Sequence, residues 1–292
     1  VAQTNKYSIR VSIIPVYDGE KIVMRLLNEG AEAYTLGQLG FEPSQLEMIE
    51  RNIKKPHGII MVTGPTGSGK TTTLYSVMNV LNSPKINIAT VEDPIEYRMP
   101  GINQSQVNTR IGFTFAVGLR SLLRQDPNII MVGEIRDIET ADIAIHAALT
   151  GHLVLSTLHT NDAATTLPRL IDMGIPSFLI AFTANLIIAQ RLVRKLCKEC
   201  ATKYKLGAAD IAELKKQMNV DALTAKLRAL KIIGAKDTLT NVDFHRPAGC
   251  RQCNEGYKGR SGIYEMLEVS KSIVELIHKH ADAGEIQKEA AR

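Results

Sequence analysis

Short, nearly all-apolar runs alternate with segments of helical periodicity through most of the chain. Such runs are typical of strands whose two faces are both covered. The runs that predict strands are residues 58–63, 86–91, 128–132 and 153–158. The segments that predict helices are residues 43–53, 70–81, 113–124, 139–149, 163–173 and 177–196. Alternation of this kind predicts an α/β fold in which helices cover both faces of a parallel sheet.

The amino-terminal part of the chain has a different pattern. Residues 8–14 and 22–27 are strand-like and flank a turn at Asp18-Gly19, which predicts a β-hairpin. Two strands do not make a stable unit alone, and the chain begins with Val1 instead of Met. We therefore expect residues 1–34 to comprise the last part of a preceding domain together with a linker.

Composition narrows the possible functions only slightly. The 292 residues are 45% hydrophobic, and no apolar run approaches the ~18 residues that cross a bilayer, which excludes an integral helical membrane protein. No signal-peptide pattern opens the sequence, and we expect a cytoplasmic protein. A net charge of +5, 5% aromatic residues and no tryptophan give little support for nucleic-acid binding.

A glycine-rich phosphate-binding motif follows the strand at residues 58–63. Residues 64–71 read GPTGSGKT, which fits the pattern GxxxxGK[ST]. Glycines let backbone N–H groups approach phosphate oxygens, Lys70 would reach the β- and γ-phosphates, and the Thr71 hydroxyl would join the Mg²⁺ shell. A buried strand before the motif and a helix after it complete the expected context. We expect ATP to bind at Gly64, Pro65, Thr66, Gly67, Ser68, Gly69, Lys70, Thr71 and Thr72.

A second predicted strand ends in a carboxylate. Residues 129–134 read IIMVGE, an apolar strand that leads to Glu134, which is the pattern of a Walker B segment. The carboxyl ends of parallel strands meet at one edge of a sheet. Glu134 is therefore expected beside the P-loop, where it would hold Mg²⁺ directly or through water.

All four cysteines of the chain lie in two C-x-x-C pairs. The pairs are Cys197 with Cys200 and Cys250 with Cys253, and 49 residues separate them. Two such pairs can close a tetrahedral structural Zn²⁺ site with no open position for catalysis. A redox function usually needs one pair only. The spacing therefore predicts a zinc-binding subdomain at residues 197–253.

Four motifs, in this order along the chain, resemble those of the secretion ATPase superfamily. After the P-loop, VEDPIEY at residues 91–97 resembles its Asp box, and residues 150–160 resemble its His box. Between them, residues 124–137 resemble the surroundings of its Walker B segment. The chain is thus similar to the ATPases of type II secretion and type IV pilus assembly, a family of hexameric RecA-like motors. The tetracysteine element resembles the assembly and secretion branches, because retraction motors generally lack it.

The resemblance implies roles for carboxylates and histidines at the nucleotide pocket. Glu96 would be the general base that orients the attacking water, and Glu134 would belong to the Mg²⁺ shell. The two carboxylates can exchange these roles. His152 and His159 would sense or contact the γ-phosphate side, although a histidine taken by itself is more often structural.

Arginines are expected to stabilise the charge that gathers on the transferring phosphoryl group. Arg10 and Arg25 stand where the family carries arginines from the domain that precedes the motor core, and we expect them to act as fingers. Arg120 and Arg124 are one helical turn apart and are further catalytic candidates. Val117 stands where many relatives have an arginine, so it has no assigned role.

The resemblance also implies an architecture. It is an α/β, RecA-like P-loop NTPase core with a remnant of a preceding α+β domain and a small zinc-binding subdomain. The expected parts are residues 1–34 from the preceding domain, residues 35–196 as the ATPase core, residues 197–253 as the zinc subdomain and residues 254–292 as a final strand and helical segment.

The implied function is that of a motor with partners. We expect a homo-hexamer that hydrolyses ATP with Mg²⁺ and powers pilin or pseudopilin assembly. It would act at the cytoplasmic face of an inner-membrane platform protein, peripheral to the membrane and without direct contact with nucleic acid. Pilus assembly and type II secretion are not separated by the sequence.

Two other functions stay open at this level. A DNA-directed RecA-like motor with a zinc element would bind phosphates with the basic segment 191–205, although such a segment is usually a solvated face. A nucleotide-binding regulator without turnover is disfavoured by the intact set of Lys70, Glu96 and Glu134.

Overall fold

The computed structural model describes residues 7–28 and 34–291. The chain divides into two compact units, which are described separately. Unit 1 comprises residues 1–192 and 262–292, and unit 2 comprises residues 193–261. The predicted linker around Gly30 and the first residue, Val1, lie outside the described residues.

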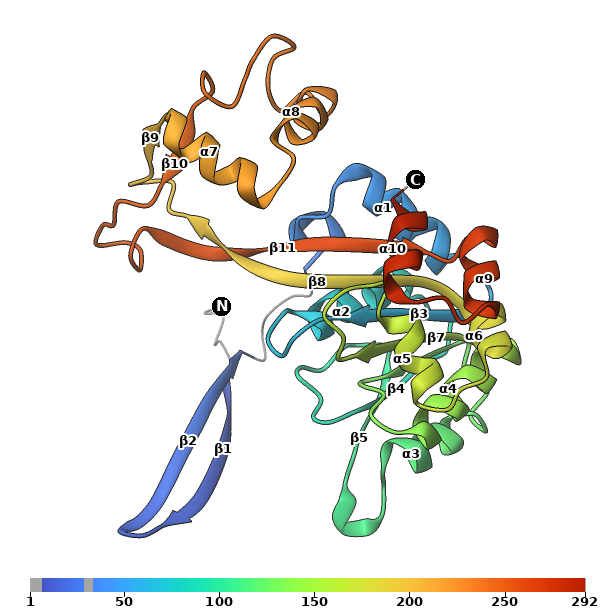
Figure 1. Cartoon of the computed structure of the whole chain (residues 1–292). Helices are drawn as coiled ribbons and strands as arrows, with labels where there is room; N and C mark the ends of the chain where they lie inside the picture. Colours follow the sequence, from blue (N-terminus) through green and yellow to red (C-terminus); the bar gives the residue numbers. More distant parts are fainter. Residues whose placement is uncertain (1–6, 29–33, 292) are drawn as a thin grey trace. The chain divides into compact units, whose positions relative to one another are not determined.

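The core of unit 1 is a seven-stranded sheet with the strand order β11-β8-β3-β7-β6-β4-β5 (Figure 1). The strands are β3 (Gly58–Thr63), β4 (Ile88–Glu92), β5 (Asn103–Gln106), β6 (Ile129–Val132), β7 (Leu153–Leu158), β8 (Ala184–Leu196) and β11 (Tyr257–Glu268). β3 pairs in parallel with β7 and β8, and β6 pairs in parallel with β7 and β4. β5 pairs in parallel with β4. The predicted parallel sheet is confirmed for these six strands.

Helices cover both faces of this sheet (Figure 1). One face is covered by η1 (Leu36–Leu39), α1 (Pro43–Ile53) and α2 (Lys70–Leu81). The other face is covered by α3 (Phe115–Leu122), α4 (Ile138–Leu149), α5 (Thr166–Asp172), α6 (Ser177–Thr183), α9 (Lys271–His278) and α10 (Ala283–Ala290). A short 3-10 turn, η2 (Thr109–Ile111), lies between β5 and α3.

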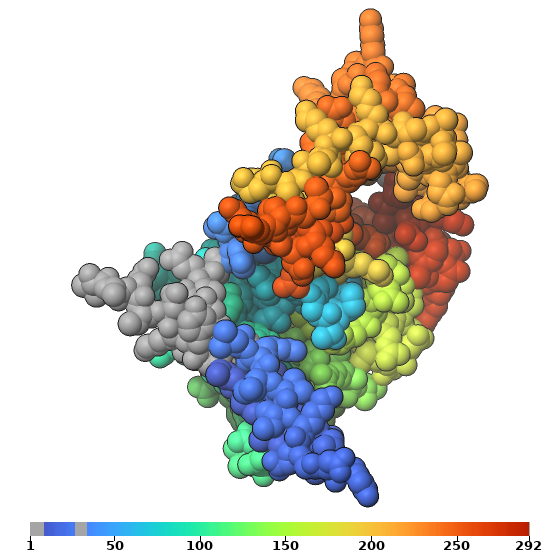
Figure 2. Space-filling model, turned by 90° about the vertical axis from the view of Figure 1, so that its left-hand side faces the viewer, coloured from blue at the N-terminus to red at the C-terminus, as the bar shows by residue number. Residues whose placement is uncertain are grey.

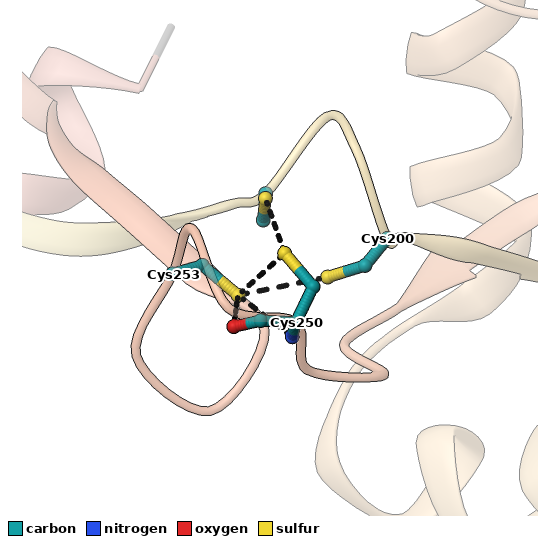
Figure 3. A group of neighbouring side chains, drawn as sticks. Cys200, Cys250 and Cys253 are labelled. Atoms are coloured by element: carbon teal, nitrogen blue, oxygen red, sulfur yellow. Dashed lines mark hydrogen bonds between the residues drawn. The ribbon is translucent and has the colours of Figure 1, made fainter.

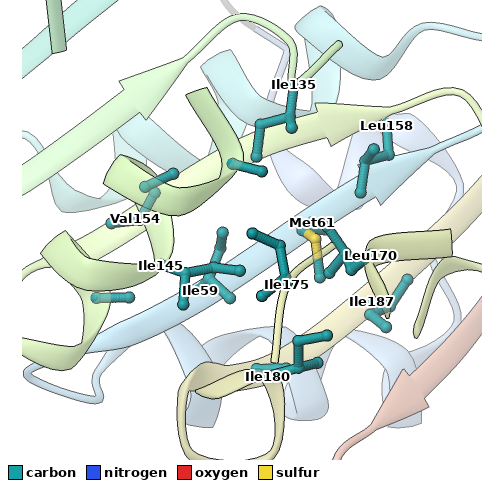
Figure 4. Packing of buried hydrophobic residues seen from close by; sticks show 14 of the residues in the cluster. Ile59, Met61, Ile135, Ile145, Val154, Leu158, Leu170, Ile175, Ile180 and Ile187 are labelled. Atoms are coloured by element: carbon teal, nitrogen blue, oxygen red, sulfur yellow. The ribbon is translucent and has the colours of Figure 1, made fainter. Parts of the chain in front are cut away.

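The pleat of the strands divides their apolar residues between two clusters. On β3, Ile59 and Met61 belong to the cluster under α3 to α6, whereas Ile60 and Val62 belong to the cluster under α1 and α2. All four side chains are buried. Figure 4 shows Ile59 and Met61 among the residues of the first cluster. A strand covered on both faces needs apolar residues at every position, which explains the unbroken apolar runs of the sequence.

The prediction of a helix over residues 177–196 is correct for its first turns only. Only Ser177–Thr183 is helical, and the chain continues as strand β8 from Ala184. β8 pairs in parallel with β3, and its residues Leu186, Ile187 and Ile188 are fully buried. Because both faces of β8 are covered here, its apolar run lacks the alternation that distinguishes a strand from a buried helix.

The predicted hairpin consists of β1 (Tyr7–Val16) and β2 (Gly19–Asn28), which pair antiparallel. Its register sets Ile9 opposite Leu26 and Val11 opposite Met24, on one face of the ribbon. These side chains are exposed, as are the other described side chains of the hairpin, drawn in blue in Figure 2.

Unit 2 is a small domain between β8 and β11. It contains β9 (Thr202–Tyr204) paired antiparallel with β10 (Phe244–Arg246), and the helices α7 (Ala208–Gln217) and α8 (Val220–Ala229). The predicted tetracysteine segment, residues 197–253, lies within this unit. Among the helices of the described residues, none combines the length and the apolar character needed to cross a membrane.

The buried sheet leads to a stability prediction for Ile130 on β6, which is fully buried. Replacing Ile130 with alanine removes packed methyl groups and leaves a cavity, so the free energy of unfolding should fall by about 2–5 kcal/mol. The matched control is Ile111→Ala on η2, where the side chain is 77% exposed. That change should stay within about 0.5 kcal/mol. Urea unfolding followed by circular dichroism measures both, and equal losses would contradict the assignment of Ile130 to the core.

Candidate functional site

Four parallel strands of unit 1 end at the same edge of the sheet. In register, Val62 of β3 pairs with Thr157 of β7, and Val132 of β6 pairs with Ser156 of β7. Val132 also pairs with Val91 of β4. The P-loop follows β3, and the Asp box continues from β4. Glu134 follows β6, and His159 follows β7. The edge at which these strands end is the candidate site.

The P-loop connects β3 to α2 and depends on glycine conformations. Gly64 has φ +140°, and a side chain there would collide with the backbone oxygen of Gln190. Gly69 has φ +90° and is the N-cap of α2, so the helix begins directly after it at Lys70. The Ser68 hydroxyl oxygen is buried and has no hydrogen-bond partner among the described residues. A helix N-terminus and a buried polar atom without a partner together fit an anionic ligand.

Lys70 is held within this loop. Its Nζ donates hydrogen bonds to the carbonyl oxygens of Gly64 at 2.9 Å and Pro65 at 3.2 Å. Burial lowers the pKa of Lys70, and the nearby Glu134 carboxylate acts in the opposite direction. The ammonium group therefore lies between the loop and an acidic side chain, in position to exchange carbonyl oxygens for phosphate oxygens.

Glu134 follows β6 and is largely buried, with its side chain 12% exposed. Its carboxylate contacts Arg136 Nη2 at 2.8 Å and His159 Nε2 at 3.3 Å. The neighbouring strand supports this turn, because the Thr157 hydroxyl donates to the Gly133 carbonyl at 2.7 Å. The structure thus brings His159 and Glu134 together at the end of the sheet.

The Asp box contributes a buried carboxylate, Glu92, at the end of β4. Glu92 is 2% exposed and accepts hydrogen bonds from the Thr90 hydroxyl at 2.6 Å, from Gln104 Nε2 at 3.1 Å and from the Tyr75 hydroxyl. Burial raises the pKa of Glu92, and the three donors oppose this shift. The carboxylate oxygens of Glu92 therefore have hydrogen-bond donors within the protein, which indicates a structural role for this residue.

The same hydrogen-bond network holds the loop that carries Glu96. The Tyr75 hydroxyl accepts from the Glu96 N–H at 3.4 Å. Gln104 accepts from the Met99 N–H at 2.7 Å and donates to the Tyr97 carbonyl at 3.2 Å. The Glu96 carboxylate itself has no hydrogen-bond partner among the described residues.

Sequence reasoning missed Tyr75 and Gln104. Tyr75 lies on α2, the helix that follows the P-loop, and its ring packs edge-on against Tyr97 with centroids 4.6 Å apart. Gln104 lies on the short polar strand β5. A hydroxyl at a fully buried helix position was the available signal, because such a group needs a polar partner.

The position of His152 differs from the prediction. His152 precedes β7, and its Nδ1 lies 3.0 Å from the Ala147 carbonyl at the end of α4. His159 follows the same strand, so the two histidines lie at opposite edges of the sheet, about 20 Å of strand apart. Within its own chain, His152 does not lie beside the P-loop, and its expected contact with the γ-phosphate side stays a prediction.

Arg10 and Arg25 face each other across the hairpin. They are directly opposed in the register of β1 and β2, so their side chains emerge on the same face, and both are exposed. Two like charges in directly opposed positions repel each other. An anion held between the guanidinium groups would relieve this repulsion, which suits a pair of phosphate-binding arginines.

Arg120 and Arg124 lie on or just after α3, at the surface. Arg120 forms an ion pair with Glu139 of α4 at 2.8 Å. Arg124 donates to the Arg120 carbonyl at 3.0 Å and so closes the end of its own helix. In the described residues neither side chain contacts the P-loop.

The four cysteines of unit 2 converge at one point (Figure 3). Their Sγ atoms all lie within 4.8 Å of one another. The Sγ atoms of Cys197 and Cys250 are 3.9 Å apart, and those of Cys200 and Cys253 are 3.7 Å apart. All four thiols are free of disulfide bonds. This group can hold a metal ion.

Comparison with known proteins gives a consistent result over the whole chain. A family model described as Type II/IV secretion system protein matches residues 1–292. The type IV pilus assembly ATPase PilB of Pseudomonas aeruginosa is 46% identical over 100% of this chain and 48% of that protein. The type II secretion system ATPase E of Vibrio cholerae is 50% identical over 96% of this chain and 52% of that protein. The chain spans about half the length of the curated relatives it matches.

A solved structure supports the fold. The crystal structure of the pilus retraction motor PilT with bound ADP has a TM-score of 0.61 and is 28% identical, and the match covers 97% of this chain and 69% of that one. The α/β core of unit 1 is thus a RecA-like ATPase fold, as predicted.

The buried network around Glu92 predicts a pH-dependent effect of Tyr75→Phe. Removing the hydroxyl leaves the Glu92 carboxylate with fewer donors, so the free energy of unfolding should fall by about 1–3 kcal/mol near pH 8. Because the folded-state pKa of Glu92 is already raised and would rise further, proton uptake favours the folded variant as the pH falls. The loss should therefore shrink toward pH 5.

Tyr264→Phe is the matched control, because that hydroxyl donates to the Leu39 carbonyl at 3.1 Å and contacts no carboxylate. Its effect should not vary over the same pH range. Urea unfolding at several pH values measures both variants. A pH-independent effect of Tyr75→Phe would contradict the assigned role of Glu92.

Proposed function

Because the chain belongs to the family of Type II/IV secretion system proteins, we propose that it is the motor part of an ATPase that powers the assembly of pilins or pseudopilins. The observation that carries this proposal is the convergence of the P-loop with Glu134 and the Glu96 loop at one edge of the sheet. Relatives named for type IV pilus assembly and for type II secretion match at similar identity, so the proposal covers both machines.

The residues at the P-loop fit ATP and Mg²⁺. The unpartnered Ser68 hydroxyl, the left-handed glycines and the first turn of α2 suit the β-phosphate, and Lys70 suits the β- and γ-phosphates. Thr71 and Glu134 would hold Mg²⁺, which neutralises charge between the phosphates when it is bound. Pro65, Thr66, Gly67 and Thr72 complete the nucleotide-binding set.

Glu96 acts as the general base in this proposal. Glu134 is engaged by Arg136 and His159, whereas the Glu96 carboxylate has no partner among the described residues. Glu96 would accept a proton from water while the water oxygen attacks the γ-phosphorus. The bond between the γ-phosphorus and the bridging oxygen then breaks, and ADP leaves. His159, which contacts Glu134, would sense the loss of the γ-phosphate.

Arginines from another rigid body would complete the site. The opposed pair Arg10 and Arg25 would act as fingers on the phosphates, brought to the P-loop by movement of the preceding domain. Arg120 and Arg124 are engaged on α3 and α4, so they would contact the nucleotide only after leaving those partners. Hydrolysis would thus be coupled to motion between rigid bodies.

The assembled motor is proposed to be a homo-hexamer. In a closed ring, the arginines of each subunit can reach the nucleotide bound to the neighbouring subunit, so every nucleotide site is completed. The ring would act in the cytoplasm against an inner-membrane platform protein, and it would be peripheral to the membrane. The family of the chain supports these proposals.

We further propose that the tetracysteine cluster binds a structural Zn²⁺. Four thiolates at 2.3 Å from a tetrahedral zinc have sulfur atoms ~3.8 Å apart. The Sγ distances of 3.7 Å and 3.9 Å between the two C-x-x-C pairs agree with this geometry. Four protein ligands leave no open coordination position, so the metal would hold unit 2 together and would take no part in hydrolysis.

Substitution of the proposed base tests the enzymatic function. Glu96→Gln should leave ATP binding intact, because Glu96 is not one of the P-loop residues proposed to bind the phosphates. The rate of phosphate release should fall by about 10²-fold or more. A coupled phosphate-release assay and equilibrium titration with labelled ATP measure the two quantities. If Glu96→Gln keeps the wild-type turnover while Glu134→Gln is inactive, the assignment of Glu96 as general base is wrong, and Glu134 takes that role.

Loss of a cysteine tests the metal site. Cys200→Ser should reduce the zinc content below one ion per chain and lower the melting temperature of unit 2, since binding and folding of such sites are coupled. Metal content is measured by atomic emission on protein purified without added zinc. A metal-free wild-type protein of unchanged stability would refute the site.

A further inference from the structure

We propose that Gln190 is a positioning residue for nucleotide binding, because its side-chain amide sets the orientation of the Ser68–Gly69 peptide in the P-loop. The inference rests on the proposed binding of ATP at this loop. Gln190 lies on β8 and belongs to none of the motifs that identified the site. Its distance along the chain from the P-loop is more than a hundred residues.

The register of the sheet brings Gln190 level with the start of the P-loop. Thr63, the last residue of β3, pairs with Ala189 of β8, so Gln190 stands beside Gly64. Its side chain is 3% exposed. Its backbone oxygen packs so closely against Gly64 that this position accepts no side chain. Gln190 therefore contacts the loop through both its backbone and its side chain.

Both ends of the side-chain amide are used. Gln190 Nε2 donates to the Ser68 carbonyl oxygen at 2.5 Å, and Gln190 Oε1 accepts from the Thr73 hydroxyl at 2.7 Å. Thr73 is in the first turn of α2, where its N–H donates to the Gly69 carbonyl at 3.0 Å. Because the Ser68 carbonyl can only accept whereas the Thr73 hydroxyl can donate or accept, the bond to Ser68 fixes Nε2 toward the loop, and Oε1 is left to accept from Thr73.

The bond to Ser68 controls an N–H group of the cradle. In a planar trans peptide the N–H points opposite to the C=O. The Ser68 carbonyl points toward Gln190, so the Gly69 N–H points away from it. Backbone N–H groups of a P-loop are the groups that bind phosphate oxygens. Gln190 thus holds one of these donors in a fixed direction before the nucleotide arrives.

Removal of these bonds should weaken nucleotide binding more than it weakens folding. Gln190→Met keeps the length of the side chain and removes both hydrogen bonds. Asn185→Leu is the matched control, because Asn185 lies on the same strand and uses its amide in the same manner, on the His57 carbonyl at 2.9 Å and Lys55 Nζ at 3.4 Å. Asn185 is at the start of β8, at the edge of the sheet away from the P-loop.

The experiment titrates the full 292-residue chain with a fluorescent ADP analogue and Mg²⁺. The dissociation constant of Gln190→Met should rise about tenfold, which corresponds to about one lost hydrogen bond at the cradle. Asn185→Leu should stay within about twofold of wild type. Thr73→Val should shift the constant in the same direction as Gln190→Met, and the double variant should lose less than the product of the two.

Each outcome decides the proposal. Wild-type affinity in Gln190→Met overturns the positioning role and leaves the proposed ATP site intact. Absence of binding by the wild-type chain overturns both. If Gln190→Met does not fold, Gln190→Glu replaces it, because a carboxylate keeps the bond to Thr73 and opposes the Ser68 carbonyl. Wild-type affinity in Gln190→Glu likewise overturns the proposal.

Discussion

The parallel pairing of β3 with β7, and of β6 with β7 and β4, makes four strands end at one edge of the sheet. Parallel strands of this kind are stable only when helices cover both faces. The two apolar clusters under the helices therefore do more than stabilise the core. They hold in place the edge at which the P-loop, Glu134, His159 and the Asp box meet.

Charges at this edge are compensated in pairs. Lys70 loses solvation inside the loop. Its ammonium group donates to the carbonyls of Gly64 and Pro65, and the negative charge of Glu134 also stabilises it. Glu134 in turn contacts Arg136 and His159. Glu92 is buried with three donors, so it serves the structure. The Glu96 carboxylate, which we propose as the general base, has no hydrogen-bond partner among the described residues.

Local patterns in the sequence predicted much of this arrangement. The apolar runs located β3 and β7 at their observed bounds, and the glycine-rich motif located the beginning of α2. The spacing of the cysteines predicted their convergence. These features depend on residues close together in the chain, or on a ligand geometry that dictates the spacing.

Features that depend on tertiary contacts were not predicted. The strand β8 was taken for a helix because both of its faces are covered, and the polar strand β5 has no apolar pattern. Gln190 and Gln104 act through hydrogen bonds to distant segments, and no local motif marks them. His152 was assigned to the pocket by the family pattern, although strand β7 separates it from His159.

The central claim is that the edge formed by the P-loop is a nucleotide-binding site. Isothermal titration of the 292-residue chain with ADP and Mg²⁺ tests it most directly, with Lys70→Ala as the comparison. The wild-type chain should bind one nucleotide per chain, and Lys70→Ala should bind at least about tenfold more weakly because an ammonium–phosphate contact is lost. Equal affinity in the two proteins, or no binding by the wild type, would contradict the claim.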